Sequence, residues 1–281
     1  MPSFKITLAY DGTDYVGWQR QANGVSIQGV VEDALRALDG RDVRVTGAGR
    51  TDAGVHALGQ VAAFTIERAL PPDAVLRALN AHLPDAIRAL AAEEAAPTFH
   101  PRFGARTKTY RYRIWNGDVI SPFERRYAWH LAGALDLDAM RAAARLLEGR
   151  HDFAAFQASG GSAQTTEREI FTLRIAASGA RSDGGDDCGS PIGDAGPVAQ
   201  SAVRTPHGAM LLFDIRGSGF LRHMVRIIVG SLVEVGRGRQ PIDWIGRVLA
   251  SRDRTSAGPT APGLGLFLVS VDYGSALAAL S

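Results

Sequence analysis

Residues 43–66 read VRVTGAGRTDAGVHALGQVAAFTI. The β-branched residues at 43–46 predict a strand, and the apolar stretch from Gln60 to Ile66 predicts another. The segment between them is charged and too rich in glycine to be the interior of a helix. This order of strand, loop and strand interrupts the regular βαβ alternation that a parallel doubly wound sheet requires.

The rest of the chain predicts strands and helices in an equally irregular order. Further strands are expected at 4–10, 108–115, 169–177, 210–215 and 266–271, and helices at 26–40, 73–82, 137–147, 220–235 and 242–250. We therefore expect an α+β fold with a mostly antiparallel sheet flanked by helices. The second part repeats the plan of the first, which predicts two similar halves, 1–104 and 105–281, on either side of a central basic cleft.

Length and composition are those of an ordinary globular protein. The chain has 281 residues, of which 46% are apolar and 21% are charged, so it can bury a core without disulfides or metals. Its one cysteine, Cys188, excludes a disulfide framework and is expected to be an inert exposed thiol. With no apolar run of signal-peptide or membrane-spanning length, we expect a cytoplasmic protein.

The segment 178–206 is an insertion with too few large apolar residues to form a core of its own. It is rich in Gly, Ser, Asp and Pro and contains Cys188. Such a composition predicts a flexible surface loop between two strands.

The formal net charge of +2 conceals two basic islands. Residues 100–126 and residues 216–254 each carry a net charge of +5, while the remainder of the chain is acidic. Of the 31 basic residues only Lys5 and Lys108 are lysines. Arginine binds phosphate and stacks on bases better than lysine does, although a solvated surface would explain the same counts.

Three stretches carry residues that could perform chemistry. In the loop of residues 47–57, Arg50 precedes Asp52 by two residues, and an arginine keeps a nearby carboxylate ionised. The alternative is an aspartate that only caps a turn. His56, which follows the loop, is expected to be a hydrogen-bonded structural residue rather than an acid or a base.

The other two stretches lie in the basic islands. On the strand predicted at 108–115, Lys108, Tyr110 and Tyr112 share one face, and Arg111 and Arg113 share the other. Aromatic residues interleaved with arginine are typical of surfaces that stack unpaired bases, although an ordinary strand has the same pattern.

In the second island, Arg222 and Arg226 would lie one turn apart on the helix predicted at 220–235. Gly217 and Gly219 would leave the amides at the start of that helix free to bind an anion. A merely solvated helix face would explain the same residues. No metal-binding or nucleotide-binding motif occurs in the chain, so neither a metal nor a cofactor is expected.

The motifs resemble those of one family over nearly the whole length. YDGTDYVGWQRQ, GRTDAGVHALGQVAAF, FHPRFGARTKTYRYRIWN, GSGFLRHMVRIIVGSLVEVGRGR and RTSAGPTAPGLGLFLVSVDY follow one another in the order found in the tRNA pseudouridine synthase A (TruA) family. The resemblance implies an isomerase that converts uridine to pseudouridine in the anticodon stem-loop of tRNA, at positions 38, 39 and/or 40. Such an enzyme would need no cofactor and would flip the target base out of its stack.

The resemblance also implies roles for individual residues. Asp52 would be the catalytic carboxylate, acting on C1′ or C2′ of the target nucleoside. Arg50 would steady Asp52 or fill the gap left by the flipped base, and Arg226 would pair with Asp52. Tyr110 would stack on the uracil and, as a further catalytic residue, could move its C5 proton. Leu266 would form a wall of the pocket. Arg111, Arg113 and Arg222 are expected to bind the RNA.

The partner implied by the resemblance is tRNA, bound across both subunits of a homodimer. Two alternatives stay open at this point. The chain could modify another RNA, such as ribosomal RNA, or it could be an RNA-binding module without catalytic activity.

Overall fold

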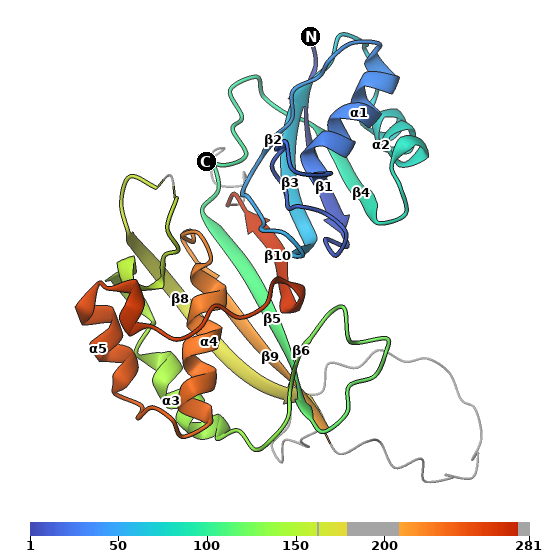
Figure 1. Cartoon of the computed structure of the whole chain (residues 1–281). Helices are drawn as coiled ribbons and strands as arrows, with labels where there is room; N and C mark the ends of the chain where they lie inside the picture. The colour runs from blue at the N-terminus through green and yellow to red at the C-terminus, as the bar shows by residue number, and fades with distance from the viewer. Residues whose placement is uncertain (162, 179–207, 275–281) are drawn as a thin grey trace, which may run out of the picture.

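The structure is a computed structural model that describes residues 1–161, 163–178 and 208–274 (Figure 1). Its strands form one mixed sheet in the order β4-β1-β3-β10-β5-β9-β8-β7, with β2 paired to β3 and β6 paired to β5. The pairings are antiparallel except for β3 with β10 and β5 with β6. The predicted α+β class and mostly antiparallel sheet are confirmed.

The N-terminal part of the sheet is covered by two helices (Figure 1). It consists of β1 (Ser3–Tyr10), α1 (Ile27–Asp39), β2 (Thr46–Gly47), β3 (His56–Thr65), α2 (Pro72–His82) and β4 (Ile87–Glu94). Alternate residues of β1, including Phe4 and Ile6, are fully buried, as expected of a strand with one face on the core. Ser26 caps α1 by accepting from the Gly29 amide, and Gly40 ends it at a φ of 80°.

Within its described residues, the C-terminal part carries three α-helices. It consists of β5 (Thr107–Gly117), β6 (Trp129–Leu131), α3 (Leu137–Arg145), β7 (Gly149–Asp152), β8 (Glu167–Ser178), β9 (Gly208–Gly217), α4 (Met224–Gly236) and α5 (Trp244–Ser251). Helix α4 is apolar on nearly every side and buries Ile227, Ile228 and Leu232 completely. No helix in the described ranges is long and apolar enough to cross a membrane.

The last strand of the chain, β10 (Leu266–Asp272), joins the two parts of the sheet. It pairs in parallel with β3 through Phe267 and Leu268, and antiparallel with β5 along most of its length. The antiparallel register brings Leu268 opposite Tyr110. The sheet therefore places β10 beside β5, whose residues lie about half a chain length away in the sequence.

His56, the first residue of β3, connects β3 to the segment that leads into β10. It is buried, its Nδ1 accepts from the Gly12 amide at 3.1 Å, and its Nε2 lies 3.1 Å from the Leu264 carbonyl oxygen. Because that carbonyl can only accept, Nε2 carries the proton. Burial lowers the pKa of His56, in part offset by Asp11, and the ring stacks on Phe267. His56 is the hydrogen-bonded structural residue that the sequence predicts.

Several predicted boundaries differ from the observed ones. The strand expected at 43–46 shortens to β2, and β3 begins at His56 rather than at Gln60. Strands β4, β6 and β7 were not predicted. The helix expected from residue 220 begins only at Met224, because His223 adopts the left-handed conformation with φ 60°. Arg222 and Arg226 therefore do not lie one turn apart on a helix, and Gly217 and Gly219 do not adjoin its first amides. The insertion 178–206, with Cys188, lies outside the described residues except for Ser178 at the end of β8.

Candidate active site

The glycine-rich loop of residues 47–55 connects β2 to β3 and is held by its backbone. Ala48 donates to the Val61 carbonyl at 2.7 Å, and the Trp18 amide donates to the Thr51 carbonyl at 3.0 Å. Two glycines permit this packing. A Cβ on Gly47 would lie 2.5 Å from the Trp18 ring, and a Cβ on Gly17, at φ 106°, would lie 2.5 Å from the Thr51 oxygen.

Buried polar side chains that pack against the loop hold it through hydrogen bonds. The Tyr10 hydroxyl and the Thr51 hydroxyl lie 2.9 Å apart, and Gln60 Nε2 donates to the Gly49 carbonyl at 2.9 Å. Burial raises the pKa of Tyr10 to about 12, so it stays protonated at neutral pH. Lys108 on β5 donates to the Ala48 carbonyl at 2.8 Å. The loop is therefore fixed by both parts of the sheet.

Asp52 extends from this loop toward the start of α4. Its Oδ2 accepts from Arg226 Nη1 at 3.1 Å, and His223 Nε2 lies 3.5 Å from the same oxygen. The Arg226 guanidinium is held in turn by its Nε, which donates to the Ala261 carbonyl at 2.7 Å. The carboxylate is thus aimed by an arginine whose own orientation is fixed, and it is not capping a turn of its own loop.

Tyr110 and Leu266 line the same cavity as Asp52. The Tyr110 ring is 8% exposed and meets Phe220 edge-on at 5.1 Å between ring centroids. Burial raises the pKa of the Tyr110 hydroxyl, and the negative charge of Asp52 raises it further. Tyr110 therefore offers a neutral aromatic ring near the carboxylate.

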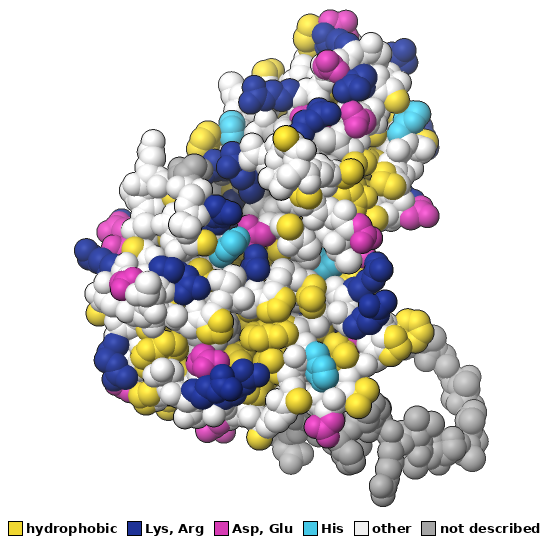
Figure 2. Space-filling model, in the orientation of Figure 1, with side chains coloured by type: hydrophobic (Ala, Val, Ile, Leu, Met, Phe, Trp, Pro, Cys, Tyr) yellow, Lys and Arg dark blue, Asp and Glu magenta, His cyan; other side chains and the backbone are white. Residues whose placement is uncertain are grey.

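The cavity has a volume of about 840 Å³ and a strongly cationic wall. Figure 2 shows Lys and Arg side chains gathered where the upper lobe of the molecule meets the lower one. Asp52 is the one carboxylate among the described lining residues. The basic residues that line the cavity are Arg44, Arg50, Arg102, Lys108, Arg168, Arg222 and Arg226.

Six of these seven basic side chains form no ion pair with any described residue; Arg226 is the exception. Elsewhere in the described chain, arginines are commonly paired: Arg111 binds Asp214 through two hydrogen bonds, and Arg113 binds Glu124. Unpaired cations around a cavity leave a positive potential that attracts an anion. A cavity of this kind is typical of an enzyme that acts on a polyanion.

Of the residues predicted for the site, Asp52, Arg50, Tyr110, Arg222, Arg226 and Leu266 line the cavity. Arg50 makes no ion pair with Asp52; Arg226 and His223 approach that carboxylate instead. Arg222 donates to the Ser159 carbonyl at 2.7 Å. Arg111 and Arg113 do not line the cavity, because they project from the face of β5 opposite to Tyr110.

Other lining residues were not singled out from the sequence. His223 stands three residues before Arg226, which was the available signal, but its approach to Asp52 depends on its left-handed backbone. For Lys108, the strand pattern predicts only that it shares a face with Tyr110 and Tyr112. Arg44 and Arg168 lie outside both basic islands, so counting charges along the chain could not find them.

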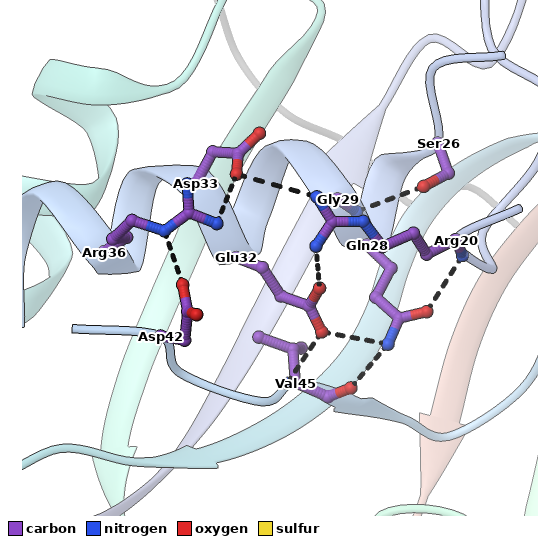
Figure 3. Close-up of polar contacts among 9 residues, drawn as sticks. All are labelled: Arg20, Ser26, Gln28, Gly29, Glu32, Asp33, Arg36, Asp42 and Val45. Atoms are coloured by element: carbon purple, nitrogen blue, oxygen red, sulfur yellow. Dashed lines mark hydrogen bonds and ion pairs between the residues drawn. The ribbon is translucent and has the colours of Figure 1, made fainter. Parts of the chain in front are cut away.

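A polar network on α1 holds one wall of the cavity (Figure 3). The Glu32 carboxylate is nearly buried and accepts from Arg20 Nη1 at 3.2 Å, from Gln28 Nε2 at 3.0 Å and from the Val45 amide at 3.2 Å. Gln28 also donates to the Val45 carbonyl and accepts from the Arg20 amide. The network ties the segment before the glycine-rich loop to the segment after Trp18, and both segments line the cavity.

The comparisons with known proteins agree with this class. A sequence model of the family described as tRNA pseudouridine synthase matches residues 6–104 and 143–274. Proteins called tRNA pseudouridine synthase A are 46% identical in Geobacter sulfurreducens and 44% identical in Pelobacter propionicus, over 97% of this chain and 100% of each relative. The Myxococcus xanthus protein of that name is 45% identical over 97% of this chain and 92% of its own length.

The chain belongs to the tRNA pseudouridine synthases, a family of isomerases. Among solved structures, a chain of an archaeal box H/ACA sRNP Nop10–Cbf5 complex aligns with a TM-score of 0.31 and 13% identity. The alignment covers 94% of this chain and 46% of the archaeal one. A likeness this slight adds nothing to the family assignment.

Proposed function

We propose that the protein isomerises uridine to pseudouridine in the anticodon stem-loop of tRNA, at positions 38, 39 and/or 40. The observation that carries the proposal is one oriented carboxylate, Asp52, in a cavity whose other charged lining residues are basic and mostly form no ion pair within the described part of the chain. Phosphates of an RNA would supply the missing anions. The names of the relatives support tRNA as the substrate.

The residues of the cavity suit the steps of this reaction. A uridine inside a stem is out of reach, so it must leave the stack at a cost of a few kcal/mol and rest on an aromatic face, which Tyr110 provides. Asp52 then acts on C1′ or C2′ of the nucleoside as the N1–C1′ bond breaks. The uracil turns, C5 bonds to C1′, and the proton lost from C5 is balanced by the proton gained at N1.

The other lining residues assist these steps. Arg226 holds the Asp52 carboxylate in place through its hydrogen bond of 3.1 Å. Leu266, at the start of β10, closes the apolar side of the pocket around the uracil. Arg50 has no ion-pair partner among the described residues, so its guanidinium is free to occupy the space that the flipped base leaves. Arg222, Arg111 and Arg113 remain proposed RNA contacts.

At the level of the whole chain, we place a central basic cleft between two similar halves, 1–104 and 105–281. The cavity supports this arrangement, because its lining residues come from both sides of the join between β3, β10 and β5. The family resemblance further supports a homodimer in the cytoplasm that binds one tRNA across both subunits. Light scattering of the purified protein, with and without tRNA, tests the dimer.

The substitution Asp52→Asn tests the catalytic assignment, because it removes the charge and leaves the shape. Purified wild-type protein is expected to form pseudouridine in unmodified tRNA, mapped by position, and Asp52→Asn is expected to lose turnover by at least about a thousandfold. Its tRNA dissociation constant should change by less than about threefold.

Three outcomes would count against the proposal. Turnover retained by Asp52→Asn would remove Asp52 from the chemistry. Pseudouridine found in ribosomal RNA and outside the anticodon arm of tRNA would favour the alternative substrate. Binding without turnover by the wild type would favour an RNA-binding module.

A further inference from the structure

Phe103 is a large apolar side chain exposed at the rim of the cavity. Its ring is 77% exposed although it belongs to the lining residues. Single exposed apolar residues are ordinary on protein surfaces and need no explanation by themselves. Phe103 differs because the surface next to it is cationic and because its backbone is fixed.

The turn that carries Phe103 is held by hydrogen bonds within the turn and by one from outside it. The amides of Arg102 and Phe103 donate to His100 Nδ1 at 3.1 and 3.3 Å, and the Gly104 amide donates to the His100 carbonyl at 2.9 Å. Beyond the turn, the Tyr273 hydroxyl donates to the Pro101 carbonyl at 2.8 Å. The backbone that carries the ring is therefore ordered, so little backbone conformational entropy is lost when a ligand binds.

The groups around the Phe103 ring are suited to bind a nucleobase together with the phosphate attached to it. The His100 ring lies 4.3 Å from the Phe103 ring between centroids, and the Arg102 guanidinium lies 5.8 Å from the Phe103 centroid. Arg102 forms no ion pair with a described residue, and its charge helps to lower the pKa of Lys108 and of Arg168, after burial. Arg102, Lys108 and Arg168 thus line the same cavity, and none of them forms an ion pair with a described residue.

We propose that Phe103, with His100 and Arg102, forms a stacking platform for an unpaired nucleobase of the bound RNA, at a position other than the target uridine. The inference rests on the proposed function. Tyr110 is almost buried and can receive a base only inside the cavity, whereas Phe103 can receive one at the rim, where the flanking nucleotides must pass. Stacking on an aromatic ring tolerates any base, so the platform would position the RNA without reading its sequence.

The test compares Phe103→Ala with Phe103→Tyr and with Phe123→Ala. Phe123 is a matched control, because its ring is 86% exposed and does not line the cavity. The probe is an anticodon stem-loop hairpin in which unpaired nucleotides are replaced one at a time by the fluorescent base 2-aminopurine. The dissociation constant, the fluorescence on binding, kcat and KM on tRNA, and the melting temperature are measured for each protein.

Phe103→Ala is expected to raise the dissociation constant and KM about tenfold, the effect of losing one base–aromatic stack, with kcat at saturation and the melting temperature unchanged. One 2-aminopurine position should lose its quenching on binding. Phe103→Tyr should restore both, and Phe123→Ala should match the wild type.

Three results would overturn the platform. The first is that Phe103→Ala matches Phe123→Ala in every RNA measurement. The second is that every 2-aminopurine position responds alike to Phe103→Ala. The third is that Phe103→Ala changes only the oligomeric state, which would assign the ring to a protein contact. The proposed function is tested separately by wild-type turnover on tRNA. If the wild type forms no pseudouridine and Phe103→Ala still weakens hairpin binding, the proposed function fails and the platform stands.

Discussion

Asp52 is oriented by side chains that reach it from a distant part of the sequence. Arg226 holds one carboxylate oxygen at 3.1 Å, and the Ala261 carbonyl in turn holds Arg226. His223 approaches the same oxygen, and burial lowers the pKa of His223 while the charge of Asp52 partly opposes that change. The carboxylate is therefore positioned by a chain of contacts rather than by its neighbour Arg50.

Lys108 gives a prediction that depends on pH. Burial, with help from Arg102 and Arg168, lowers its pKa from 10.5 to about 8, so its positive charge is present below pH 8 and is lost as the pH rises above it. If Lys108 faces RNA phosphate, the affinity of the wild type for tRNA should fall about fivefold between pH 7 and pH 9, the factor that corresponds to ~1 kcal/mol. Lys108→Arg should hold its affinity over this range, since arginine stays charged.

The chain offers a matched control for this measurement. Lys5, the only other lysine, lies on β1 beside Glu93 and does not line the cavity, so Lys5→Arg should follow the wild type. Dissociation constants measured at constant ionic strength across the pH series decide the matter. Equal pH dependence in the wild type and Lys108→Arg would show that Lys108 does not contact the RNA.

At the level of single residues, most of the candidate site could be predicted from the sequence. GRTDAGVHA and HMVR are local motifs that carry the family resemblance, so Asp52 and Arg226 could be proposed through that resemblance. The ion pair of Arg111 could not, because Asp214 lies on the neighbouring strand β9 and is about a hundred residues away from Arg111 in sequence. Alternation along a strand predicts which side chains share a face, and not which face borders the cavity.

Helix α1 shows how one element positions another. Its apolar stripe, including Val31 and Leu35, could be predicted from the helical period, and these residues are buried. The burial of Glu32 could not be predicted, because its three donors come from Arg20, Gln28 and Val45, two of which lie outside the helix (Figure 3). The helix thereby connects the core of the N-terminal part to the wall of the cavity.

This network predicts an unequal effect of two neighbouring substitutions. Glu32→Ala leaves the buried Val45 amide without its acceptor and Gln28 with only the Val45 carbonyl, so the free energy of unfolding should fall by about 2–3 kcal/mol. KM for tRNA should rise, because the segments that carry Arg44 and Gln21 lose their anchor. Asp33→Ala, next in sequence, removes only exposed ion pairs with Arg36 and Arg20 and should cost less than about 0.5 kcal/mol.

Urea denaturation and steady-state kinetics of the two variants check this expectation. Equal losses of stability in Glu32→Ala and Asp33→Ala would mean that the buried network contributes no more than a surface pair. A loss of stability in Glu32→Ala without a change in KM would separate the network from the shape of the cavity.

Over the whole molecule, the distribution of charge in space differs from its distribution along the chain. The two basic islands supply Arg102, Lys108, Arg222 and Arg226 to the cavity, whereas Arg44, Arg50 and Arg168 come from segments whose net charge is negative. Within the second island, Arg237 and Arg239 pair with Glu234, and Arg247 pairs with Asp243. Only folding decides which cations are neutralised, which is why counting along the sequence could indicate a polyanionic partner but could not locate its binding surface.

This difference can be measured through the salt dependence of tRNA binding. Each phosphate contact that is removed should lower the slope of log affinity against log salt by roughly 0.7–0.9, because fewer counterions are released. The triple variant with glutamine at Arg44, Arg102 and Arg168 should therefore reduce the slope by about 2–3. The triple variant with glutamine at Arg237, Arg239 and Arg247 makes the same change in net charge, yet it should keep the wild-type slope, since those cations already have carboxylate partners. Equal slopes for the two triple variants would show that net charge, and not the unpaired cations of the cavity, governs binding.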